Sequence, residues 1–300
     1  MAVSLEFLAS PSAFLTEAGE HLAQDSVLST VVATMAHRGA AVEQRGGDLP
    51  PDDWWLVARS VGADGAGEVV GVAMRSAPFA PRPLFVLPMP QEAAVALAHA
   101  LHGRGEEVLA LNGALPATQV CADELARLAS RKATVAVHSR LHQLQSVVPP
   151  RVPAGDLRPA TYADLPLALA WYAAFFVDAD QQAGRPVGTH AAEVPPPDEM
   201  LRRIASGDLW IWEVDGTPVH LSALNPPSFG AARIGPVFTP PEHRGRGYAG
   251  ATVAALAQIA LDAGATPCLF TDQANPVSNA LYARIGFTPV VDMANLVLEA

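Results

Sequence analysis

Apolar and polar positions in the second half of the chain follow two different periods, and the changes between them predict a series of strands and helices. Short apolar runs bounded by turn residues are typical of strands, whereas apolar positions that recur at intervals of three and four are typical of helices. Asp215-Gly216 separates two apolar runs and predicts a β-hairpin. The expected elements are, in chain order, strand 157–160, helix 164–177, helix 198–206, strand 209–214, strand 218–224, strand 232–239, a helix that begins at or just after Gly247, strand 268–271, helix 275–285 and strand 290–298.

The first half repeats part of this order. In both halves a strand passes through a proline-containing step into an alanine-rich helix, at 86–90 and again at 237–241. Asn112 and Asn275 each end a strand and precede a helix that starts with proline. The pattern predicts a distant internal duplication with a proline-rich linker at 148–155, and therefore two domains, residues 1–150 and residues 151–300. The other elements expected in the first half are strands 54–61, 68–75, 84–87, 108–111 and 134–137, and helix 116–129.

The composition limits the partners. The chain has 300 residues, of which half are hydrophobic and 16% are charged, so two ordinary cores can be built. The formal net charge of −11 makes a nucleic-acid backbone a poor partner, because phosphate contacts need clustered basic residues. An acidic surface tolerates a cationic amine as a substrate.

The cysteines and the longest apolar runs bear on the compartment. Cys121 and Cys268 lie far apart in apolar stretches and form no metal-type pair, which favours a reduced environment and no metal. No run reaches the roughly 18 apolar residues of a membrane span. The expectation is a cytoplasmic protein that does not associate with a membrane.

A glycine-rich turn is the most informative segment, at Arg244-Gly245-Arg246-Gly247-Tyr248-Ala249-Gly250. The first N–H groups of the helix that follows have no partner inside the helix, and together with the helix dipole they form an anion site. Glycine lets the backbone adopt positive φ and approach a pyrophosphate without a Cβ clash. The two arginines add positive charge in a geometry that suits phosphate oxygens.

This turn resembles the signature of the GCN5-related N-acetyltransferase (GNAT) superfamily, Gln/Arg-x-x-Gly-x-Gly/Ala, which Arg244, Gly247 and Ala249 satisfy. The order of elements from 157 to 298 is also similar to that family. The resemblance implies an α/β (α+β) fold, two tandem GNAT-like domains that are each a mixed, mostly antiparallel sheet flanked by helices. It also implies direct transfer of an acetyl group from acetyl-CoA to an amine, with Arg244, Gly245, Arg246, Gly247, Tyr248 and Ala249 around the coenzyme pyrophosphate.

The resemblance assigns further roles on either side of the turn. Backbone groups of Val237-Phe238-Thr239 are expected to meet the pantetheine amides and the acyl carbonyl, and Gly235-Pro236 predicts a bulge in that strand. Asn275 and Ser278 are expected near the pantetheine arm, although both could serve only to cap a helix. Tyr282 is the expected general acid for the departing thiolate, because a phenol stays protonated at neutral pH; a half-buried packing role is the alternative.

The general base stays open. The strand 232–239 contains no acidic residue, so Glu213, His220, Asp272 and a water-relayed path remain equal candidates.

Two other functions compete with the acetyltransferase. Gly245-x-Gly247-x-x-Gly250 with Asp272 fits a dinucleotide-binding oxidoreductase, but only 28 residues follow Asp272, too few for the rest of a doubly wound sheet. A non-catalytic acyl-CoA sensor would share the coenzyme turn. In the first half Gln91-Glu92 replaces the glycine turn, so that domain is expected to be degenerate, and to shape the cleft for a small-molecule or peptide amine or to mediate homodimer formation.

Overall fold

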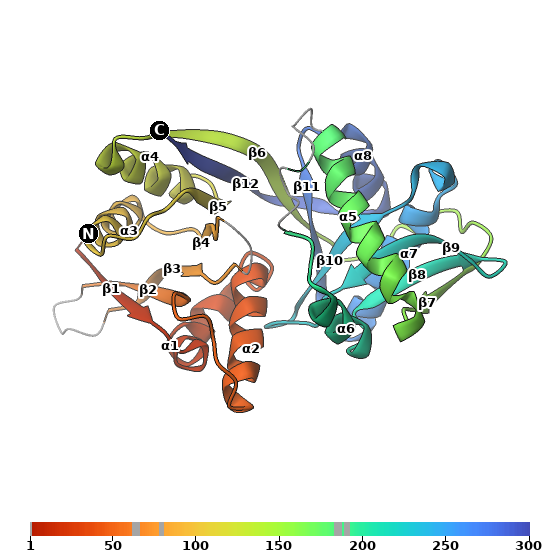
Figure 1. Cartoon of the computed structure of the whole chain (residues 1–300), viewed down its shortest axis with the longest axis horizontal. Helices are drawn as coiled ribbons and strands as arrows, with labels where there is room; N and C mark the ends of the chain where they lie inside the picture. Colours follow the sequence, from red (N-terminus) through yellow and green to blue (C-terminus); the bar gives the residue numbers. More distant parts are fainter. Residues whose placement is uncertain (1, 62–66, 78–80, 183–187, 189–192) are drawn as a thin grey trace. The chain divides into compact units, whose positions relative to one another are not determined.

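The chain forms two compact units in the computed structural model, which describes residues 2–61, 67–77, 81–182, 188 and 193–300. The first unit comprises Met1–Leu141 together with Val290–Ala300, and the second comprises His142–Pro289. The first unit is therefore built from two separate segments of the chain (Figure 1).

The sheet of the first unit takes one of its strands from the end of the sequence. β12 (Thr288–Glu299) lies between β5 (Ala110–Ala114) and β6 (Lys132–Gln143), and its pairing with β5 is antiparallel, with Asn295 opposite Asn112. On the other side of β5 the order continues through β4 (Leu84–Val86), β3 (Val69–Arg75), β2 (Trp54–Ser60) and β1 (Val3–Leu8). β4 and β5 are parallel, whereas β1, β2, β3 and β4 pair antiparallel in succession.

Four helices described in this unit are α1 (Pro11–Gln24), α2 (Thr30–Gln44), α3 (Gln91–Gly103) and α4 (Ala117–Ala129). α3 and α4 bury one apolar face each, and their leucines, such as Leu97 and Leu125, share a core cluster with Leu84 of β4. The strands and helices expected from residue 54 onward are present, whereas β1, α1 and α2 were not predicted. A local signal for α1 existed: the Ser10 side chain accepts the N–H of Ala13 at 3.1 Å, and proline occupies the first turn.

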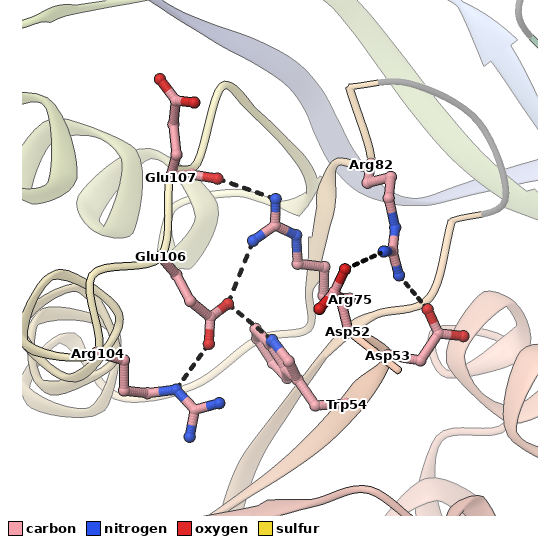
Figure 2. A network of polar contacts seen from close by, with 8 residues as sticks. All are labelled: Asp52, Asp53, Trp54, Arg75, Arg82, Arg104, Glu106 and Glu107. Atoms are coloured by element: carbon pink, nitrogen blue, oxygen red, sulfur yellow. Dashed lines mark hydrogen bonds and ion pairs between the residues drawn. The ribbon is translucent and has the colours of Figure 1, made fainter. Parts of the chain in front are cut away.

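A network of arginines and acids joins several loops of the first unit (Figure 2). Glu106 accepts hydrogen bonds from Trp54 Nε1 at 2.9 Å, Arg75 Nη1 at 3.2 Å and Arg104 Nε at 2.6 Å. Arg104 also lies 4.2 Å from the centre of the Phe7 ring. A single, largely buried carboxylate therefore satisfies donors from β2, β3 and the loop after α3.

We expect Glu106→Gln to lower the free energy of unfolding by about 2–3 kcal/mol, because an amide N–H₂ replaces one acceptor oxygen among three donors. The neighbouring Glu107 is a matched control, since its side chain is 68% exposed and pairs with Arg131 on the surface. Glu107→Gln should cost less than about 1 kcal/mol. Urea unfolding measures the free energy of unfolding of both variants. Equal losses would show that Glu106 contributes no more to stability than an exposed ion pair.

The second unit contains a sheet like that of the first. Its strands follow the order β7 (Asp156–Pro159), β8 (Leu209–Val214), β9 (Thr217–Leu224), β10 (Ala231–Phe238), β11 (Thr266–Asp272) and the end of β6. β10 and β11 are parallel, and the pairs among β7, β8, β9 and β10 are antiparallel. Asp215 and Gly216 both have positive φ between β8 and β9, so the predicted hairpin is confirmed.

Helices α5 (Leu165–Gln182), α6 (Pro197–Ala205), α7 (Tyr248–Asp262) and α8 (Pro276–Ile285) flank this sheet, as predicted, although α5 runs five residues beyond its expected end. Both units are thus mixed, mostly antiparallel sheets flanked by helices, which confirms the predicted fold class. Among the described residues, no helix is long and apolar enough to cross a membrane.

Candidate coenzyme site

The parallel strands β10 and β11 of the second unit share only a short stretch of pairing. Their register joins Ala231, Ala232 and Arg233 of β10 to the first residues of β11, whereas β10 continues to Phe238. On its other side β10 is paired with β9 again at Val237 and Phe238, after a register shift that follows Ile234. The predicted bulge at Gly235-Pro236 is therefore confirmed. We call the β10 edge from Ile234 to Phe238, which faces away from β9 and has no β11 register partner, the open edge.

The glycine-rich turn leads directly into α7. Gly247 is the N-cap in a left-handed conformation, φ 91°, and Gly245 has φ 76°. The first backbone bond of the helix runs from Ala251 N–H to Gly247 C=O at 3.0 Å. In the described chain, none of the N–H groups from Gly245 to Gly250 donates to a protein acceptor. These donors, with the positive end of the helix dipole, are suited to an anion.

The described residues leave room beside the two glycines of the turn. Among them, a Cβ built on Gly247 would have only the Arg151 carbonyl oxygen in reach, at 4.0 Å, and one on Gly245 would meet nothing within 4 Å. The glycines are therefore required by positive φ rather than by crowding. Free amides next to free space fit the pyrophosphate of coenzyme A.

The two arginines of the turn have contacts within the protein. Arg244 Nε donates to the Thr239 carbonyl at 2.9 Å, and its guanidinium pairs with Asp178 of α5, while 41% of the side chain stays exposed. Arg246 Nη2 donates to the Glu242 carbonyl at 3.1 Å. Arg244 therefore links the end of β10 to α5.

Tyr248 and Gly250, at the start of α7, pack against other elements of the second unit. The Tyr248 ring is buried in a cluster with Trp212 and Val219, while its backbone N–H is one of the free amides of the turn. A Cβ on Gly250 would lie 3.3 Å from Leu281 Cδ1, which shows that α7 packs closely on α8 at this point.

Asn275 caps α8, with Pro276 in the first turn, as predicted. Its Oδ1 accepts the Ser278 N–H at 3.1 Å, and its Nδ2 donates to Gln182 Oε1 of α5 at 2.5 Å. Ser278 is half-buried. Asp178 and Gln182 thus contact two residues expected to bind coenzyme, but neither was predicted, because both lie beyond the expected end of the helix at residue 177.

Tyr282 lies in the core beneath the start of the open edge. It is 6% exposed, belongs to the cluster that contains Ile234 and Leu269, and meets the Phe287 ring edge-on at 6.0 Å between centroids. Burial raises the pKa of the Tyr282 phenol above its usual value, so the group holds its proton at neutral pH.

The three candidate bases have different surroundings. Glu213 accepts from Arg158 Nε at 2.8 Å, and Asp272 accepts the Ala274 N–H at 2.8 Å. His220 is fully buried and hydrogen-bonded to Thr239 at the end of β10.

The corresponding strands of the first unit stay together. β4 pairs with β5 up to Val86, its last residue, and a Cβ on Gly113 would lie 2.1 Å from the Val86 carbonyl oxygen. At the start of α3, a hydrogen bond from its own backbone N–H lowers the pKa of the Glu92 carboxyl. In the described part of the first unit, β4 therefore has no counterpart of the open edge, and a carboxylate lies at the start of α3.

Comparison with protein families gives a match over most of the second unit. Residues 171–287 match the model described as the acetyltransferase (GNAT) family, and they form a GNAT domain within the second unit. No curated protein matches the chain at a significant level.

Solved structures resemble the chain over nearly its full length. A GNAT-family acetyltransferase from Colwellia psychrerythraea is 15% identical, with 99% of this chain and 100% of that chain covered and a TM-score of 0.57. A tandem GNAT protein from the clavulanic acid biosynthesis pathway is also 15% identical, with coverage of 99% and 98% and a TM-score of 0.57. A Drosophila protein reaches a TM-score of 0.68 at 12% identity, with coverage of 99% and 98%. Because these similarities cover both units, the whole chain has the fold of tandem GNAT proteins.

Proposed function

From the GNAT domain at residues 171–287 as a premise, we propose that this protein is an N-acetyltransferase that moves an acetyl group from acetyl-CoA directly to a small-molecule or peptide amine. The observation that carries the proposal is the combination, in one unit, of the open edge of β10 with the free amides of the glycine turn. A thioester whose pyrophosphate lies on Gly245–Gly250 would direct its pantetheine arm along Val237-Phe238-Thr239.

The chain's own residues account for two of the polar steps, polarisation of the carbonyl and protonation of the sulfur. Backbone N–H groups of the open edge would polarise the thioester carbonyl and stabilise the negative charge that develops on its oxygen. The amine nitrogen forms a bond to the carbonyl carbon, the carbon–sulfur bond breaks, and the sulfur leaves with the bonding electrons. Tyr282, which is protonated, would supply the proton to the sulfur; the amine gives up a proton to water, and water returns one to Tyr282.

Two measurements test the proposal. Acetyl-CoA should raise the melting temperature, whereas NAD(P) should not, and an amine panel with acetyl-CoA should release free thiol. Binding without thiol release for any amine would indicate the acyl-CoA sensor instead, and stabilisation by NAD(P) alone would support the oxidoreductase.

We also propose that the first unit is a degenerate GNAT-like domain, and we expect one acetyl-CoA per chain. The paired end of β4 and the Glu92 carboxylate both oppose a bound pyrophosphate there, since a carboxylate repels phosphate. Isothermal titration calorimetry should saturate at one equivalent. A stoichiometry of two would require a second coenzyme site in the first unit.

A further inference from the structure

His220 of β9 bridges two hydroxyl groups inside the second unit. Its Nδ1 is 2.7 Å from Thr239 Oγ1, and its Nε2 is 2.9 Å from Ser222 Oγ. The His220 side chain is completely buried, and burial lowers the pKa of its imidazole to about 3. The ring is therefore neutral at pH 7, with one N–H to donate and one nitrogen to accept, which two hydroxyl groups can satisfy together.

This arrangement does not suit a general base. A base needs a free lone pair within reach of the amine and a pKa near the working pH. Both ring nitrogens of His220 are already engaged with hydroxyl groups, so neither offers a free lone pair to the amine.

The position of Thr239 suggests a different role. Phe238 and Leu221 are the last register partners of β10 and β9. Thr239 comes directly after Phe238 and His220 directly before Leu221, so the two residues lie side by side at this end of the antiparallel pair. The Thr239–His220 hydrogen bond thus extends the contact between these strands by one residue, at the end of β10 where no β11 partner remains. The Thr239 carbonyl is held as well, by Arg244 Nε.

We propose that His220, supported by Ser222, is a positioning residue that ties the end of β10 to β9 and so fixes the open edge for the pantetheine arm. This inference rests on the proposed function. Without the tie, the last residues of β10 are held to β9 only by the pairs at Val237 and Phe238 beyond the bulge, so Thr239 and the end of the open edge are less firmly oriented. The pyrophosphate site on α7 does not depend on this tie, because its donors are the first amides of a helix.

The test compares a ligand with the pantetheine arm to one without it. For His220→Leu and Thr239→Val we expect the Kd of acetyl-CoA to rise about tenfold, because both variants lose the Thr239–His220 hydrogen bond, and the Kd of ADP to stay within about twofold. His220→Leu also breaks the hydrogen bond to Ser222. Thr239→Ser should recover most of the affinity lost in Thr239→Val. The double variant should be no weaker than the weaker single variant, because both remove the same interaction.

Thr252→Val is the matched control. Thr252 is fully buried in α7, and in the described residues its Oγ1 has no hydrogen-bond partner, so the same substitution removes a hydroxyl without breaking a bond. In the Thr252→Val variant, the ratio of the affinities for acetyl-CoA and ADP should equal that of the wild type. If His220→Leu fails to fold, Thr239→Val against Thr239→Ser carries the test alone.

The outcomes distinguish the positioning role of His220 from the proposed function. Equal weakening of ADP and acetyl-CoA, or unchanged affinity for both, overturns the positioning role while leaving acetyl-CoA binding by the wild type intact. A wild-type protein that binds ADP but not acetyl-CoA overturns the proposed function itself, and the positioning role with it.

Discussion

Gly247→Asp is expected to abolish acetyl-CoA binding while the second unit stays folded. The substitution places a Cβ and a negative charge in the space beside the free amides, where the pyrophosphate would lie. Wild-type protein should gain about 2.7 kcal/mol of stability at one hundred times the Kd of acetyl-CoA, and the variant should gain none. Thermal unfolding with and without acetyl-CoA measures both values.

Gly264→Asp is the control for this experiment. Gly264 also has positive φ, 74°, with no described atom within 4 Å of an added Cβ, so both variants carry a similar strain of about 1–2 kcal/mol. Gly264 follows the other end of α7, roughly 22 Å away for a helix of 15 residues. Acetyl-CoA should stabilise the Gly264→Asp variant as much as the wild type. If Gly247→Asp were stabilised to the same extent, the glycine-rich turn would not be part of the coenzyme site.

Tyr282→Phe is expected to lower kcat by about 10²-fold with little change in the Kd of acetyl-CoA, within the usual range for acid–base groups. The ring and its contact with Phe287 are kept, and only the proton donor is lost. Thiol release gives kcat, and calorimetry gives the Kd.

Tyr172→Phe provides the comparison, because Tyr172 is another buried tyrosine of the second unit and its hydroxyl accepts from Arg203 Nη1 at 3.2 Å. It should lose about 1 kcal/mol of stability and keep its turnover. If Tyr282→Phe turns over as fast as Tyr172→Phe, the phenol of Tyr282 serves packing alone.

Local chemistry explains which parts of the fold could be predicted. Asp215-Gly216 and Asn275-Pro276 impose turn and cap geometry on their own neighbours, so the hairpin and the start of α8 follow from a few residues. Gly235-Pro236 predicted its bulge for the same reason, since proline lacks a ladder donor.

The missed features depend on residues far apart in the sequence. β1 is defined by its pairing with β2, in which Val3 lies opposite Ser60. α2 has small apolar residues on most sides, which leaves no clear polar face to mark it as a helix. The contacts of α5 with Arg244 and Asn275 join positions that no short-range periodicity relates.

The place of β12 in the first unit also sets an order for folding during translation. Asn112 and Asn295 are paired but about 180 residues apart, so at typical elongation rates a ribosome needs roughly 10–40 s between them. During that interval β5 and β6 of the nascent chain lack the strand that separates them, and each presents an unpaired edge. The part of the protein that is made first therefore completes its sheet only after the GNAT domain has been synthesised.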